Sequence, residues 1–226
     1  MPGLDGSGRF YAPLERELAD EFDLKVLSYD GSRFDGYAGL VEELSPQLPS
    51  GNDVVLVAES FAGPLGVLLA RRHPDRLKAL VLAATFVHAP LPCSPLLAAC
   101  LGRLPALRPP DVLLHGFLAG RGRMTAELRC ELDEALRAIP LSILRLRALA
   151  ALRADVRAEL SELAIPLLYL QAVDDRLIGS QAGRKVLRHA RHARLVRVDA
   201  PHFLFQTAPG EAAAAIRNFL STNIDG

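Results

Sequence analysis

The sequence has no excess of charge and no apolar run long enough to cross a membrane. Its 226 residues include 26 Lys and Arg against 26 Asp and Glu, so the formal net charge is zero. Such a chain has no overall field that would attract nucleic acid or an anionic lipid surface. The amino terminus also lacks a basic segment followed by an apolar one, the pattern of a secretory signal. We therefore expect a cytoplasmic protein with no nucleic-acid partner and no membrane span.

Cysteine is scarce, and its distribution excludes two kinds of scaffold. Cys93, Cys100 and Cys130 are an odd, scattered set without a Cys-x-x-Cys pair. This argues against a disulfide framework or a zinc site and fits a reducing compartment. We expect all three to be buried or partly buried thiols. No motif indicates a metal, nucleotide or flavin, so no cofactor is expected.

The hydrophobic pattern alternates between short strands and amphipathic helices. Half of the residues are hydrophobic, which suffices for one core but not for two. The predicted strands are residues 24–29, 54–57, 79–84, 166–171 and 195–198. The predicted helices are residues 10–22, 35–48, 65–70, 180–190 and 211–220. This alternation predicts an α/β fold with a mostly parallel sheet covered by helices on both faces.

Residues 89–163 differ in character from the rest of the chain. They are rich in Leu, Ala and Arg, are interrupted by several prolines, and show no strand pattern. They are therefore predicted to form a helical insertion that acts as a lid over the carboxyl ends of the strands. The expected organisation is a core of residues 1–88 and 164–226 with a lid of residues 89–163.

Ser60 stands where a buried strand runs directly into an apolar helix. The β-branched run of residues 54–57 precedes it, and the small residues Ala58, Ala62 and Gly63 flank it. Small residues are needed there because strand and helix backbones crowd at a sharp turn. The arrangement is a variant of Gly-x-Ser-x-Gly, which exposes a nucleophilic serine above a sheet. The alternative is an ordinary helix cap, for which serine is also a preferred residue.

Further functional side chains follow later strands of the predicted sheet. Asp174 and Asp175 come after the strand at 166–171, and His202 comes after the last strand. The carboxyl ends of parallel strands gather at one edge, where functional groups meet. A serine hydroxyl needs an imidazole base, and a carboxylate holds that imidazole in the correct tautomer. The order Ser, Asp, His is that of α/β hydrolases, and it favours Ser60 as a nucleophile.

The sequence resembles an α/β hydrolase of the small esterase or thioesterase type with a helical lid, over nearly the whole chain. The resemblance rests on four motifs: PGLDGSG at residues 2–8, AESFAG at 58–63, VDDRLI at 173–178 and PHF at 201–203. In the family the acid precedes a short pair ending in an apolar residue, which selects Asp175 over Asp174. His202 takes the position of the base, although Pro201 replaces the usual glycine.

The resemblance also implies an oxyanion hole and an apolar pocket. The backbone N–H groups of Leu4 and Phe61 would bind the oxyanion, and such a donor typically contributes about 3–4 kcal/mol to the transition state. Phe86, Phe117 and Phe203 would line the substrate pocket. The alternative for the glycine-rich residues 3–8 is an ordinary flexible loop.

The start of the sequence departs from the family pattern. The oxyanion loop normally follows a central strand and an amino-terminal hairpin, yet only Met1 precedes it here. Either the start is truncated or the sheet has lost its first strands, and both leave Leu4 with less support. Terminal segments are commonly disordered unless a sheet holds them. We expect Leu4 to be held less firmly than in the family.

These features predict a serine hydrolase that cleaves small carboxylic esters through an acyl-enzyme. A serine nucleophile argues against the dehalogenases and epoxide hydrolases of this fold. One alternative is hydrolysis of a thioester or of an ester carried by an acyl carrier protein, or acyl transfer to another acceptor. An acidic carrier could bind the arginines of the lid, which are Arg137, Arg145, Arg147, Arg153 and Arg157. The other alternative is a non-catalytic ligand-binding protein of the same fold.

Overall fold

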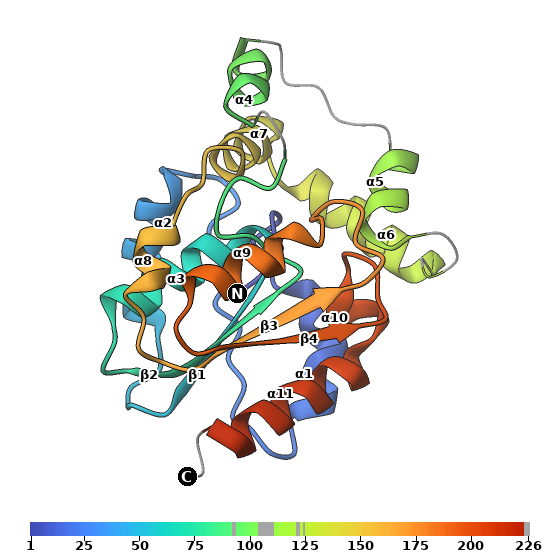
Figure 1. Cartoon of the computed structure of the whole chain (residues 1–226). Coiled ribbons are helices and arrows are strands. Elements are labelled where there is room, and N and C mark those ends of the chain that lie inside the picture. Colours follow the sequence, from blue (N-terminus) through green and yellow to red (C-terminus); the bar gives the residue numbers. More distant parts are fainter. Residues whose placement is uncertain (92–93, 104–110, 121–122, 124, 224–226) are drawn as a thin grey trace.

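A four-stranded parallel sheet forms the centre of the molecule (Figure 1). The computed structural model describes residues 1–91, 94–103, 111–120, 123 and 125–223. The strands are β1 (Val54–Glu59), β2 (Leu77–Ala83), β3 (Leu167–Ala172) and β4 (Ala193–Val198). They lie side by side in chain order. The parallel sheet predicted from the alternating pattern is thus confirmed.

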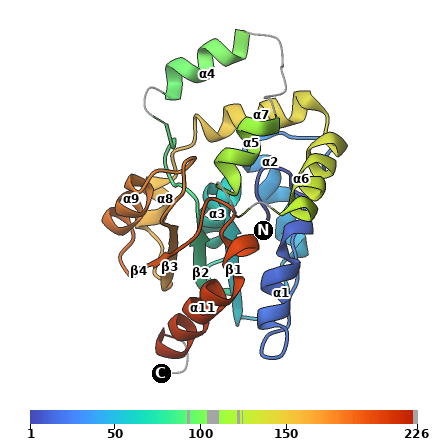
Figure 2. The same cartoon turned by 90° about the vertical axis from the view of Figure 1, so that its right-hand side faces the viewer.

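Helices cover both faces of this sheet, because each parallel connection must cross back over it. Leu65 of α3 and Val186 of α9 pack into the core on one face, and Leu14 of α1 and Phe219 of α11 pack into the core on the other. Figures 1 and 2 show the two layers. The helices of the sheet layers are α1 (Ala12–Leu18), α2 (Gly36–Leu44), α3 (Gly63–Arg72), α9 (Gln181–His189), α10 (Leu204–Thr207) and α11 (Pro209–Asn223). Short 3-10 turns are η1 (Arg9–Tyr11), η2 (Ser45–Gln47) and η3 (Ser60–Ala62).

The described residues between β2 and β3 form helices and one isolated antiparallel bridge, between His88 and Asp155. These helices are α4 (Ser94–Arg103), α5 (Asp111–Leu118), α6 (Ala126–Ala138), α7 (Leu141–Ala151) and α8 (Arg157–Ser161). Figure 2 shows α4 to α7 beyond one end of the sheet. The N–H of Phe203, in the loop after β4, donates to the carbonyl of Leu118 at 2.7 Å, so α5 meets the carboxyl end of the sheet. The boundaries of a lid domain at residues 89 and 163 stay a prediction.

Several predicted elements are wrong in extent or type. In place of the predicted helix at 10–22, the chain forms the turn η1 and then α1, which ends at Leu18. The carbonyl of Leu18 accepts from the N–H groups of both Glu21 and Phe22. The predicted helix at 35–48 ends as α-helix at Leu44, because Pro46 converts the next turn to η2. Residues 24–29 form no strand.

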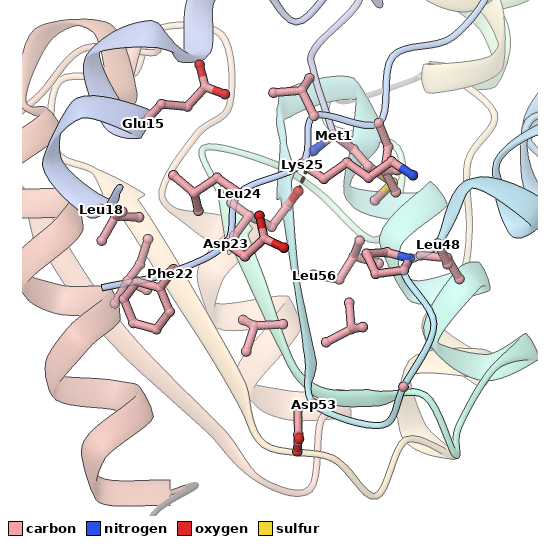
Figure 3. Close-up of a pocket in the computed structure, with 18 of the residues that line it drawn as sticks. Met1, Glu15, Leu18, Phe22, Asp23, Leu24, Lys25, Leu48, Asp53 and Leu56 are labelled. Atoms are coloured by element: carbon pink, nitrogen blue, oxygen red, sulfur yellow. Dashed lines mark hydrogen bonds between the residues drawn. The ribbon is translucent and has the colours of Figure 1, made fainter. Parts of the chain in front are cut away.

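An apolar groove explains the missing strand. It has a volume of about 700 Å³ and lies between β1 and residues 22–27 (Figure 3). A segment becomes a strand only by hydrogen bonding to a neighbouring strand, and the groove separates residues 24–29 from the edge of β1. Leu24 is 37% exposed beside it. The residues have strand-like composition, but no strand lies within their reach.

Met1 lies along the free edge of β1, near the carboxyl end of that strand. Its ammonium group donates to the carbonyl of Val57 at 2.7 Å, and the N–H of Glu59 donates to the carbonyl of Met1 at 3.2 Å. This pair of bonds is the pattern of a parallel ladder. The hydroxyl of Tyr11 also donates to the Met1 carbonyl, at 2.6 Å. These bonds tie the first residue to the sheet, whereas the comparison of Leu4 with the family stays a prediction.

The expectation of buried thiols is also wrong for two cysteines. Cys100 in α4 and Cys130 in α6 are free and exposed. In α6, Leu132 and Ala135 face the interior, which leaves Cys130 on the solvent side of the helix. Cys93 lies outside the described residues. Among the helices that the structure describes, none is both long and apolar enough for a bilayer crossing.

Gly63 allows the close approach of α3 to the end of β2. A methyl group at residue 63 would lie 2.0 Å from Oγ1 of Thr85 and 2.9 Å from the carbonyl oxygen of Phe86. We expect Gly63→Ala to lower the free energy of unfolding by about 2–3 kcal/mol, measured by urea denaturation. Gly102→Ala is the control, because no described atom lies within 4 Å of its added methyl. A Gly63→Ala protein as stable as wild type would contradict this packing.

Candidate active site

Ser60 lies on a strained turn at the carboxyl end of β1. Its φ is +52°, a left-handed conformation that is unfavourable for a residue with a side chain. Ala58 and Ala62 are fully buried, so that β1 and α3 meet closely around the turn. The hydroxyl of Thr85 donates to the carbonyl of Ser60 and ties the turn to the end of β2. The sharp turn expected from the sequence is thus present, and it projects the serine side chain from the end of the strand.

His202 and Asp175 complete a chain of hydrogen bonds with Ser60. Oγ of Ser60 lies 2.8 Å from Nε2 of His202, and Nδ1 of His202 lies 2.8 Å from Oδ2 of Asp175. The three residues follow β1, β4 and β3, which end at the same edge of the sheet. The side chains of His202 and Asp175 are each only 2% exposed. The structure therefore brings together the three residues predicted as catalytic.

Asp175, and not its neighbour Asp174, holds the imidazole. Oδ1 of Asp175 accepts from the N–H groups of Leu177 and Ile178, both at 2.8 Å, which leaves Oδ2 for His202. Asp174 is exposed. Other histidines bond elsewhere: His73 to Ser45, His88 to Lys185, His115 to Asp133 and His189 to the carbonyl of Lys185.

The loop of residues 2–8 lies beside Ser60. A methyl group at Gly3 would stand 3.5 Å from Cβ of Ser60, which is ordinary contact distance. Leu4 follows Gly3 directly, and Phe61 follows Ser60 itself, so each predicted oxyanion donor adjoins one of these two neighbouring residues; their role as donors stays a prediction. The hydroxyl of Tyr29 donates to the carbonyl of Pro2 at 2.8 Å and to that of Gly3, which holds the loop from its other side.

The three phenylalanines predicted to line a pocket have different surroundings. Phe86 is 3% exposed within the core, whereas Phe117 on α5 is 45% exposed. The ring of Phe203 packs on that of Phe10, with 5.4 Å between their centroids. The apolar groove along β1 involves none of the three. A common pocket of these residues stays a prediction.

Glu59 is a site residue that sequence reasoning missed. It precedes Ser60 and is 5% exposed, and Nε2 of Gln206 lies 3.4 Å from its Oε1. Burial raises the pKa of this carboxyl to about 7, against the opposing effects of His202 and of the bond from Gln206. Strand alternation gives no signal for its burial, because Glu59 shares a face with the half-buried Val55 and Val57.

The fold and this geometry together define an α/β hydrolase. The sequence profile of the family described as serine aminopeptidase, S33, matches residues 33–204, well over half of the chain. The chain therefore belongs to this family.

One relative and two solved structures are similar to this chain over most of its length. A protein of Caulobacter sp. (strain K31), RutD, whose name proposes a carbamate hydrolase, is 27% identical over 97% of this chain and 88% of its own. A hydrolase from Oleispira antarctica has a TM-score of 0.84 at 17% identity, covering 98% of this chain and 89% of that one. The enol-lactonase from Burkholderia xenovorans LB400 has a TM-score of 0.83 at 19% identity, covering 97% and 88%. The two structures share the fold.

The buried carboxyl of Glu59 should make stability depend on pH. Its pKa rises from an ordinary 4.5 to about 7 on folding, so the folded state binds the proton more tightly. The resulting stabilisation is complete below pH 4.5 and is lost as the pH rises through 7. We expect Glu59→Gln to remove this loss, which amounts to about 1–3 kcal/mol between pH 5 and 8.

Urea denaturation of both proteins at several pH values measures the difference. The Met1 ammonium has the opposite trend, because burial lowers its pKa to about 5 and its contribution is lost as the pH falls. Glu59 and the Met1 amino group each affect the other's pKa, so the difference between the two proteins reports the loss of Glu59 together with its effect on Met1. Identical pH profiles for wild type and Glu59→Gln would show that Glu59 titrates normally.

Proposed function

We propose that this protein is a serine hydrolase that cleaves small carboxylic esters through an acyl-enzyme. The observation that carries the proposal is the continuous hydrogen-bonded series of Ser60, His202 and Asp175, with both separations at 2.8 Å. A serine within reach of an imidazole that a buried carboxylate orients is the arrangement required for nucleophilic catalysis. Membership in a hydrolase family supports the same class of reaction.

The first half of the proposed reaction forms the acyl-enzyme. Oγ of Ser60 attacks the ester carbonyl carbon while Nε2 of His202 takes the hydroxyl proton, and Asp175 stabilises the imidazolium. The N–H groups of Leu4 and Phe61 donate to the resulting oxyanion. His202 then gives its proton to the departing alkoxide, which leaves as the alcohol.

The second half releases the acid. His202 takes a proton from a water molecule, whose oxygen attacks the acyl carbon and forms a second oxyanion. When that intermediate collapses, the bond to Oγ breaks and His202 returns the proton to Ser60. The enzyme is regenerated and the carboxylic acid departs. An acceptor alcohol or thiol in place of water would make the same enzyme an acyltransferase.

Two considerations favour an ester as the substrate. The residues predicted to line the pocket, Phe86, Phe117 and Phe203, carry no charge and suit a neutral acyl group. A lactone is a cyclic ester, so the likeness to an enol-lactonase supports the same bond type. A carbamate is the other substrate class to assay, because of the name of the Caulobacter relative. We also propose a cytoplasmic location, consistent with the free thiols of Cys100 and Cys130.

Hydrolysis of an acyl group bound to a carrier protein is the second candidate function. Fewer arginines of this protein can contact such a carrier than the sequence suggests. Arg147 is fully buried and cannot contact a carrier, so its inclusion in that surface is wrong. Arg157 pairs with Asp155 at 2.7 Å, and Arg137 lies 3.8 Å from Asp133. Docking of an acidic carrier on the exposed arginines would be weakened by salt. A rate on carrier-bound substrate that does not change with salt would exclude this candidate.

The acyl-enzyme predicts a burst of product. Mixing the protein with p-nitrophenyl acetate, butyrate and octanoate should release p-nitrophenol rapidly, up to one equivalent, before steady turnover. Ser60→Ala should abolish the burst and lower turnover by at least about 10⁴-fold. Folded wild type that is silent on all three esters would favour the non-catalytic alternative, and turnover that persists in Ser60→Ala would exclude the mechanism.

The neighbouring aspartates offer a matched pair of variants. Asp175→Asn should reduce kcat roughly 10²- to 10⁴-fold, because the amide no longer holds the imidazole in the required tautomer. Asp174→Asn should stay within about twofold of wild type, since Asp174 is exposed and His202 bonds to Asp175. Steady-state kinetics on the best p-nitrophenyl ester measures both. Equal losses in the two variants would contradict the assigned role of Asp175.

A further inference from the structure

Arg147 is a fully buried cation in the helical segment between β2 and β3. It lies on α7, and its guanidinium stands 4.8 Å from the centroid of the Tyr29 ring. Its Nη1 donates to the carbonyls of Leu4 at 2.9 Å and of Asp5 at 3.0 Å, and its Nη2 donates to the carbonyl of Asp30. The carboxylates of Asp5, Asp30 and Glu43 act on the guanidinium electrostatically, but among the described residues none of them forms an ion pair with it. Its Nε has no hydrogen-bond partner. Its partners are thus backbone carbonyls.

Those carbonyls belong to the loop that lies against Ser60. Four successive carbonyls of this loop are held from one side: those of Pro2 and Gly3 by the Tyr29 hydroxyl, and those of Leu4 and Asp5 by Arg147. The N–H of Gly6 adds a bond to the Gly3 carbonyl at 3.2 Å. The path of the loop is therefore determined by two side chains that stack on each other.

The direction of the Leu4 N–H follows from this arrangement. The Gly3 carbonyl and the Leu4 N–H belong to one peptide group, and no described peptide bond is cis. In a trans peptide the two point in opposite directions. Holding the Gly3 carbonyl toward Tyr29 therefore turns the Leu4 N–H away from Tyr29. Arg147 fixes the next two carbonyls and so prevents the peptide from rotating.

We propose that Arg147 is a positioning residue for the oxyanion hole, which it sets by clamping the Leu4 and Asp5 carbonyls from α7. The proposal rests on the proposed hydrolase function. It has a structural consequence: α7 belongs to the segment predicted to be the lid, so a displacement of α7 moves the loop that carries an oxyanion donor. Burial of a charge is costly, and a packing role alone would be served by an apolar residue. The hydrogen bonds to the Leu4 and Asp5 carbonyls are a role that only a charged or polar donor at this position can fill.

Arg147→Met tests the clamp, because methionine retains apolar length but has no donor. We expect kcat to fall about 10- to 100-fold on the best ester, since one oxyanion donor is misplaced, with KM within about threefold of wild type. We also expect amide hydrogen exchange in residues 3–8 to accelerate at least about 10-fold, while β1 to β4 keep their protection. Arg147→Lys keeps the charge but not the planar fork and should give intermediate values of both.

Arg129→Met is the matched control, because Arg129 is exposed on α6 of the same helical segment. It should leave kcat and the exchange of residues 3–8 unchanged. If Arg147→Met fails to fold, Arg147→Lys carries the test through the same two measurements. Wild-type kcat in a folded Arg147 variant, or a lower kcat with unchanged exchange in residues 3–8, would overturn the proposal.

The two measurements also separate this proposal from the proposed function. If wild type shows no turnover of any ester, the function fails, but exchange in residues 3–8 still reports whether Arg147 holds the loop. If wild type gives a burst dependent on Ser60 and the Arg147 variants are indistinguishable from it, only the clamp fails.

Discussion

The left-handed turn at Ser60 is the constraint on which the rest of the structure depends. A residue with a side chain at φ +52° costs about 1–3 kcal/mol, so the surroundings must enforce it. They do so by packing: the residues next to the turn are Ala58, Ala62 and Gly63, and a larger group at Gly63 would meet Thr85. The buried β1 and β2 strands behind the turn supply the rigidity. The apolar core thus sustains the strain at the point where a nucleophile is presented.

The parallel sheet turns distant parts of the chain into neighbours. Ser60, Asp175 and His202 are far apart in sequence, yet each follows a strand that ends at the same edge, and side-chain bonds of 2.8 Å join them. The carboxylate of Asp175 also accepts two backbone N–H groups, so its orientation is set before it meets the imidazole. The site is therefore organised in the absence of substrate, which limits the reorganisation needed during reaction.

Much of this arrangement could be predicted from the sequence, because strand runs, small residues and the order Ser, Asp, His are local signals. What could not be predicted depends on tertiary contacts. An arginine on a helix ordinarily faces solvent, and nothing in the pattern of α7 indicates that Arg147 reaches the loop at Leu4. The burial of Glu59 and the exposure of Cys130 are likewise set by packing between separate elements. Residues 24–29 have the composition of a strand, and only the groove beside β1 shows why they are not one.

The pairing of Met1 with the edge of β1 has a practical consequence for work with this protein. The amino group of Met1 bonds to Val57 and the Met1 carbonyl to Glu59, three residues and one residue before Ser60. In contrast, α11 ends on the side of the sheet away from α4 to α7 (Figure 1). An affinity tag fused before Met1 would replace that amino group with an amide and would lead its residues toward the apolar groove. A tag at the carboxyl terminus would leave these contacts as they are. A tag at the amino terminus therefore perturbs the edge beside Ser60, and the carboxyl terminus is the position that leaves it unchanged.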